Sequence, residues 1–192
     1  MLRRRHYSLL LGGNTLNQSS KCAIGGIVAA LSLVILISVA IIPFLTYALP
    51  AAAGILIIPI VIEIDKKWAF GVYATVAILG ALLVPNKEVA AMYIAFFGYY
   101  PIIKAILEGH FKNWIAWILK TVSFVVSIGA SYYVLIALMG LEIDEIETYG
   151  LIAVPMLLGA GTVAFIIYDI ALTKIIELYL AKWRKIFKRY FK

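Results

Sequence analysis

The sequence predicts an all-α, polytopic integral membrane protein with about six transmembrane helices. Of its 192 residues, 64% are hydrophobic and only 14% are charged, and the mean hydropathy is +1.01. A soluble domain averages about 25% charged residues and is under half apolar. Apolar runs recur along the chain at the roughly 20 residues that one crossing of a ~30 Å hydrocarbon layer requires. These runs are continuous rather than alternating, so helices are expected instead of a closed barrel.

The first three predicted spans end at prolines or charged residues. The first covers about Ala23–Ala48 and is the membrane anchor. The second, about Pro50–Ile64, starts on a proline, which suits the first position of a helix, and ends in EIDKK. The third, about Trp68–Val84, ends at PNKE. The second and third spans are short, so re-entrant segments remain an alternative for both.

The last three spans are longer than the second and the third. The fourth, about Glu88–Leu107, contains IAFFGYYPIIK, and a bend is expected because Pro101 has no N–H to complete the helix. The fifth covers about Trp114–Leu141, and the sixth runs from about Tyr149 to the low 170s. Three regions result: a basic tail (1–22), a six-helix transmembrane domain (23–173) and a basic amphipathic C-terminal helix (174–192).

The distribution of basic residues predicts the orientation of these spans. With both termini cytoplasmic, Lys87 is the one lysine or arginine outside, together with the acidic segment 142–147. The positive-inside rule therefore places a multi-pass protein in the cell membrane with both ends inside. The net charge of +7 then marks a surface that attracts anionic lipid headgroups, at about 1 kcal/mol per residue. Membrane lipids are the expected partner, and nucleic acid is not.

The sequence carries no motif for catalysis. It lacks a G-x-x-x-x-G-K-[ST] loop, an H-E-x-x-H helix and a G-x-S-x-G turn. Its two histidines and single cysteine lie far apart and predict no metal site. Ser123, Ser127 and Ser131 share one helix face, where small residues favour close packing of helices. We therefore expect a non-enzymatic protein without a cofactor or a metal.

Three charged residues fall within the predicted spans. Lys104, Lys120 and Asp169 lie toward the cytoplasmic ends of spans four, five and six. Ionisable groups inside a membrane are costly and usually pair or serve a function. Ion pairing of Asp169 with one or both lysines is favoured over a proton relay, because two cations would hold a single carboxylate ionised.

Several tyrosines lie in the predicted outer half, where a ligand would arrive. The candidates for substrate binding are Tyr47, Tyr93, Tyr132 and Tyr149. Aromatic walls with a few polar groups are typical of small-molecule sites. The alternative is an interfacial belt, which tyrosine also forms because its ring is amphipathic.

The chain is similar to a known protein family in its size, in its predicted topology and in the sequence of its first two spans. The sequence AIGGIVAALSLVILISVAIIPF leads into LTYALPAAAGILIIPIVIE, and Leu49–Pro59 is similar to a P-A-L-A-G-like second segment. In these features the chain resembles the substrate-binding (S) components of energy-coupling-factor (ECF) vitamin transporters.

That resemblance implies a subunit that captures a vitamin or similar small molecule. It would associate with a transmembrane coupling subunit and two cytoplasmic ATPases. Docking in the family uses small residues spaced by four on the first helix, which here are Gly25 with Ala29 and Gly26 with Ala30. The alternative function is a small, non-catalytic membrane scaffold or assembly factor.

Overall fold

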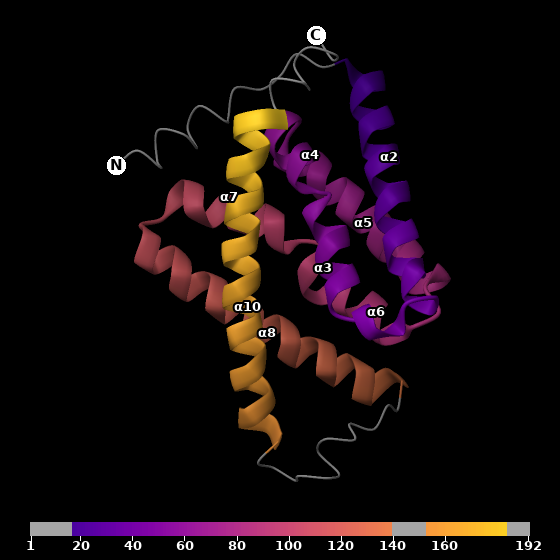
Figure 1. The fold of residues 1–192 in the computed structure, drawn as a ribbon, viewed down its shortest axis with the longest axis vertical. Helices are drawn as coiled ribbons and strands as arrows, with labels where there is room; N and C mark the ends of the chain where they lie inside the picture. Colours follow the sequence, from indigo (N-terminus) through magenta and orange to yellow (C-terminus); the bar gives the residue numbers. More distant parts are fainter. Residues whose placement is uncertain (1–16, 140–152, 184–192) are drawn as a thin grey trace.

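The structure is a computed structural model that describes residues 17–139 and 153–183, with the backbone alone at 113, 131–139 and 153–158. Helices and turns make up this described part, as Figure 1 shows, which confirms the all-α prediction. Three helical segments are long and apolar enough to cross a membrane: Gln18–Ala40, Lys66–Leu83 and Lys87–His110. About six crossings, and their orientation, remain predictions.

The first helix ends before its predicted limit at Ala48. Helix α2 covers Gln18–Ile37, and the 3-10 turn η1 (Ser38–Ala40) extends it. A second 3-10 turn, η2 (Pro43–Leu45), follows Ile42, whose φ of −125° and ψ of 72° are not helical. The residue before a proline is pushed out of the helical region by the proline ring. Pro43 therefore ends the helix, and the predicted boundary is wrong.

The second predicted span consists of two short helices. Helix α3 (Ala48–Ile55) and helix α4 (Ile58–Glu63) are separated by a turn, and a proline lies in the first turn of α4. Even if straight, Ala48–Glu63 would measure roughly 24 Å at about 1.5 Å per residue. This length is less than the ~30 Å hydrocarbon layer, which favours the re-entrant alternative for this segment.

The third helix matches its prediction. Helix α5 (Lys66–Leu83) begins at Asp65, whose side chain accepts a hydrogen bond from the Lys66 main-chain N–H at 2.7 Å. It ends before Pro85, and an 18-residue helix of this composition is long enough to cross.

The fourth helix is interrupted where Pro101 predicts. It comprises α6 (Lys87–Met92), the π-helical turn η3 (Tyr93–Phe97) and α7 (Tyr100–His110). The Gly98 main-chain N–H bonds the Tyr93 carbonyl at 2.8 Å, which is the wide spacing of a π-turn. Pro101 lies in the first turn of α7, so the irregular backbone directly precedes the residue that lacks an N–H.

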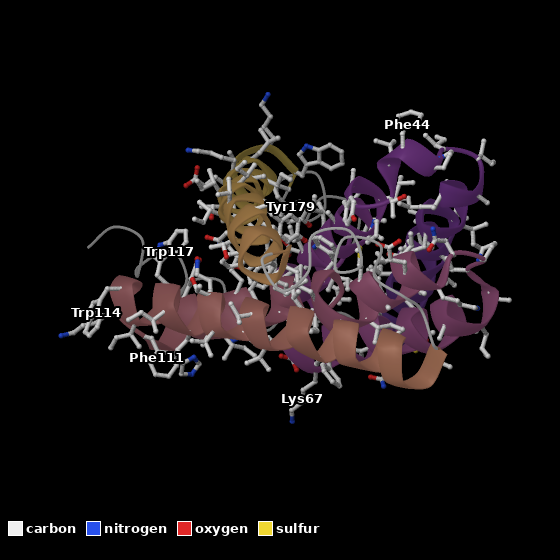
Figure 2. The ribbon with its side chains drawn as sticks, turned by 90° about the horizontal axis from the view of Figure 1, so that it is seen from below. Phe44, Lys67, Phe111, Trp114, Trp117 and Tyr179 are labelled. Atoms are coloured by element: carbon white, nitrogen blue, oxygen red, sulfur yellow. The ribbon has the colours of Figure 1, made fainter. Side chains whose placement is uncertain are left out.

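The last two helices are steeply inclined to one another. Helix α8 covers Asn113–Met139, and helix α10 (Ala153–Leu178) continues into the π-turn η5 (Tyr179–Trp183). In Figure 1, α8 crosses α10 obliquely. Figure 2 shows α8 from the side, whereas α10 is viewed nearly down its axis. Helix α10 passes residue 173 without a break, so the predicted C-terminal helix begins as a continuation of it.

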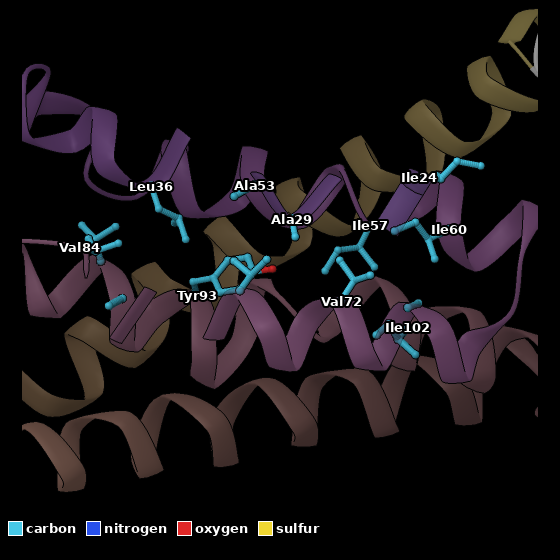
Figure 3. Packing of buried hydrophobic residues seen from close by; sticks show 14 of the residues in the cluster. Ile24, Ala29, Leu36, Ala53, Ile57, Ile60, Val72, Val84, Tyr93 and Ile102 are labelled. Atoms are coloured by element: carbon cyan, nitrogen blue, oxygen red, sulfur yellow. The ribbon is translucent and has the colours of Figure 1, made fainter. Parts of the chain in front are cut away.

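Apolar side chains cover both the inside and the outside of the fold. A core cluster, drawn in Figure 3, joins α2, α3, α5 and the fourth helix through residues such as Leu36, Ala53 and Tyr93. On the outside, Ile27, Leu31 and Val34 of α2 are 49–61% exposed and recur on one helix face. Helices α5, α8 and α10 likewise expose Ile78, Leu82, Val122, Val126, Val163 and Ile167. Faces of this kind suit contact with lipid.

We predict that Gly54→Ala destabilises the protein. A Cβ at Gly54 would overlap the main-chain carbonyl of Phe97, so α3 and η3 would have to separate. The expected loss is about 1–3 kcal/mol of unfolding free energy, seen as a lower Tm in detergent. Gly71→Ala is the matched control, because nothing lies within 4 Å of a Cβ there. An equal Tm for both variants would contradict the predicted α3–η3 contact.

Candidate functional site

Four charged side chains from three helices form a closed network, which we term the charge ring. Asp169 of α10 pairs with Lys104 of α7, and through its other carboxylate oxygen with Lys120 of α8 at 2.9 Å. Glu108 of α7 completes the ring, with its Oε1 3.0 Å from the Lys104 Nζ and 2.9 Å from the Lys120 Nζ. Two cations and two anions therefore balance.

Three members of the charge ring are buried and Glu108 is partly buried, and neighbouring groups add hydrogen bonds to the ring. Lys104, Lys120 and Asp169 are 0%, 1% and 3% exposed. The Tyr100 hydroxyl donates to the Asp169 carboxylate at 2.6 Å. The Asp169 main-chain carbonyl accepts from the Thr173 hydroxyl at 2.9 Å and from the Lys104 Nζ at 3.2 Å. Buried charges persist only when paired and hydrogen-bonded in this way.

Local geometry and one tertiary contact together build the charge ring. Lys104 and Glu108 are four residues apart, so they share a face of α7. The chain reverses between α7 and α8, which places Lys120 beside that face, and α10 then brings in Asp169. The structure thus brings together the three charges that the sequence predicts. It also adds Glu108, which lies just after the predicted fourth span. The spacing of four residues from Lys104 is the feature of the sequence that could have predicted this pairing.

Aromatic rings pack directly beside the charge ring. The Phe96 ring lies within 6.4 Å, centroid to centroid, of six others: Phe97, Tyr99, Tyr100, Phe124, Phe165 and Tyr168. The Phe124 and Phe165 rings stack at 4.8 Å and join α8 to α10. The Tyr99 hydroxyl bonds the Ser127 hydroxyl on α8. The aromatic residues of IAFFGYYPIIK therefore contact other helices, and none is exposed.

Of the four tyrosines predicted to bind substrate, the structure describes the side chains of two, Tyr47 and Tyr93. Tyr47 is 63% exposed in the turn before α3. Tyr93 is 0% exposed, and its hydroxyl has no hydrogen-bond partner among the described residues. The side chain of Tyr132, and the whole of Tyr149, lie outside the described residues.

The residues predicted for partner docking divide between two faces of α2. Gly25 faces α5, where a Cβ would lie 3.1 Å from Val72, and Ala29 is buried in the core cluster. Gly26 and Ala30 are exposed, and nothing lies within 4 Å of a Cβ at Gly26. A partner could reach only the second pair, because α5 covers the first.

No group of three or more histidine, cysteine or acidic side chains in the described ranges could hold a metal ion. Comparison of the chain with protein-family models, with curated proteins and with solved structures finds no match. The resemblance to S components therefore stays a prediction, based on the sequence features given above.

We predict that Asp169→Asn destabilises the protein strongly. The change leaves two buried lysines facing the single carboxylate of Glu108. Breaking a buried ion pair from one side costs about 3–5 kcal/mol. The measurement is thermal or denaturant unfolding in detergent, followed by helical circular dichroism.

Lys174→Gln is the control for that experiment. Lys174 is exposed and pairs with Glu177 at 3.2 Å on the surface of α10. Exposed pairs contribute little to stability, so this variant should unfold at the wild-type temperature. If Asp169→Asn did so too, the charge ring would not be fastening α7, α8 and α10.

Proposed function

We propose that this chain is the membrane-embedded substrate-capture subunit of a multi-component importer for a vitamin or similar small molecule. The observation that supports this most is the buried hydroxyl of Tyr93, which lacks a partner among the described residues in a largely apolar core. Leaving such a group unsatisfied costs about 1–3 kcal/mol. A bound small molecule would supply the missing hydrogen bond, as polar groups do in apolar binding sites.

Three features of the fold support a place in the membrane. The long helices expose apolar faces, three segments are long enough to cross, and the buried charges pair internally. The first turn of α2 and the last turn of α10 lie at the same end of the molecule in Figure 1. An even number of crossings, with both termini cytoplasmic, would produce that placement.

Energy for import would come from partners. The sequence has no nucleotide-binding loop, so separate ATPases and a transmembrane coupling subunit would drive release of the substrate. The exposed pair Gly26 and Ala30 on α2 is the surface proposed for the coupling subunit, because small residues let two helices approach closely in lipid.

A scaffold or assembly factor is the second candidate, and one surface favours it. Phe111, Trp114 and Trp117 are 38–65% exposed and gather at one end of the molecule, as Figure 2 shows. Aromatic residues are enriched both in protein interfaces and at the lipid headgroups. A scaffold would use this surface to hold another membrane protein.

Purification of the chain from its native membrane in detergent separates the two functions. An importer subunit should carry a small molecule, together with a coupling subunit and ATPases that mass spectrometry identifies. Gly26→Leu should remove those proteins, because the larger side chain blocks close approach of a partner helix. Gly71→Leu, on an exposed face of α5, is the control and should retain them.

A chain without a small molecule, bound to an unrelated membrane complex, would refute the importer function. Loss of that complex on replacing Trp114 with Ala would then support the scaffold.

A further inference from the structure

Two tyrosine hydroxyls on different elements have no hydrogen-bond partner among the residues that the structure describes. Tyr93 belongs to η3 and Tyr168 to α10, and both hydroxyl oxygens are buried without a partner in the described part of the chain. The Tyr73 and Tyr100 hydroxyls, in contrast, donate to the Ile94 carbonyl and to Asp169, each at 2.6 Å. The missing bonds at Tyr93 and Tyr168 therefore distinguish them from the neighbouring tyrosines Tyr73 and Tyr100.

The backbone at Gly54 lies next to the Tyr168 hydroxyl and contacts η3, the π-turn that carries Tyr93. A Cβ at Gly54 would be 3.2 Å from the Tyr168 hydroxyl and would meet the Phe97 carbonyl. Pro101 has no N–H to offer that carbonyl, so a further acceptor lies at the same place. In Figure 3 the Tyr93 ring lies beneath Ala53, the neighbour of Gly54, within the same core cluster.

We propose that the Tyr93 and Tyr168 hydroxyls are the polar contacts of a small-molecule site at Gly54, between α3, η3 and α10. The ligand is an uncharged, planar molecule that can hydrogen-bond. This inference names the substrate class for the proposed importer and rests on that function. Each phenol can donate or accept one bond, so the ligand offers an amide or a similar group.

Charge and shape define this ligand class. The two lysines and two carboxylates of the charge ring match one another, so they leave no spare charge for an ionic ligand. Transfer of an unpaired ion into such a core is prohibitive. The Phe97 ring stands edge-on to Tyr168 at 5.1 Å, and Phe96 lies at 6.3 Å. Aromatic surroundings of this kind suit a flat ring.

Access to the site requires movement of short elements. Helix α3 has 8 residues, and the 5-residue π-turn η3 interrupts the helical segment Lys87–His110. Gly54 allows these two elements to touch, because it has no side chain at the contact. Separation of α3 from η3 would expose both hydroxyls.

Three matched probes test the inference on the full-length chain in detergent. Benzamide is planar and neutral, whereas benzoate and benzamidine have the same ring with a negative or a positive charge. We expect benzamide to raise the Tm of the wild type in a saturable way, and the charged probes to leave it unchanged. Tyr93→Phe and Tyr168→Phe should each weaken benzamide binding by about 10-fold, the loss of one hydrogen bond.

The same variants distinguish a ligand contact from a structural bond. Each removes a hydroxyl without a partner in the described residues, so the probe-free Tm should stay the same or rise. Tyr73→Phe is the control, because it breaks the bond to the Ile94 carbonyl. It should lower the probe-free Tm and keep wild-type affinity for benzamide.

Four results would overturn the inference: no Tm shift with benzamide, equal shifts with the charged probes, unchanged affinity in both phenylalanine variants, or a probe-free Tm lowered as in Tyr73→Phe. These outcomes are separate from the test of the importer function. Co-purified ATPases without benzamide binding would support the importer function and refute the ligand site at Gly54. Benzamide binding without transport partners would support the ligand site and refute the importer function.

Discussion

The Asp169 carboxylate is the point at which three helices are held together. It accepts hydrogen bonds from Lys104 on α7 and Lys120 on α8, while Glu108 bridges the two lysines. In a medium without water, each of these charges would be costly alone, so they stabilise the fold only as a set. The stacked rings of Phe124 and Phe165 then pack α8 on α10. Because α8 and α10 are steeply inclined to one another, their contact is expected at one place and not along the whole length of both helices.

The interrupted fourth helix provides the second constraint. Pro101 removes a backbone donor, and the preceding turn widens into η3. Glycines let neighbours approach this irregular backbone: a Cβ at Gly98 would lie 2.6 Å from the Tyr73 ring, and one at Gly54 would meet the Phe97 carbonyl. The same interruption directs Tyr100 toward Asp169, while Tyr93 packs in the core cluster drawn in Figure 3. The interruption at Pro101 therefore affects the charge ring through Tyr100 and the proposed ligand site through Tyr93.

The polar groups of the charge ring and those of the proposed ligand site differ in how they are paired. Every charge in the ring has an opposite partner, so binding there would have to break a stable network. The hydroxyls of Tyr93 and Tyr168 lack partners in the described residues, and each would gain a bond from the proposed ligand. The exterior of α2, α5, α8 and α10 is apolar, which suits lipid and small-residue docking of another helix.

The sequence by itself determined the helical class, the limits of α5 and the interruption at Pro101, because hydropathy and a missing N–H act locally. Lys104, Lys120 and Asp169 could be expected to meet, since their helices were placed in alternating directions. Tertiary structure alone decided that Glu108 also pairs with Lys120 on α8, and that Gly25 is covered by α5 whereas Gly26 is not. The end of the first helix at Pro43 has a local cause, which the predicted boundary missed. Only the fold could show that Tyr93 is buried while Tyr47 is exposed. The burial of a side chain depends on which neighbours pack against it, and a nearly uniform apolar sequence does not reveal those neighbours.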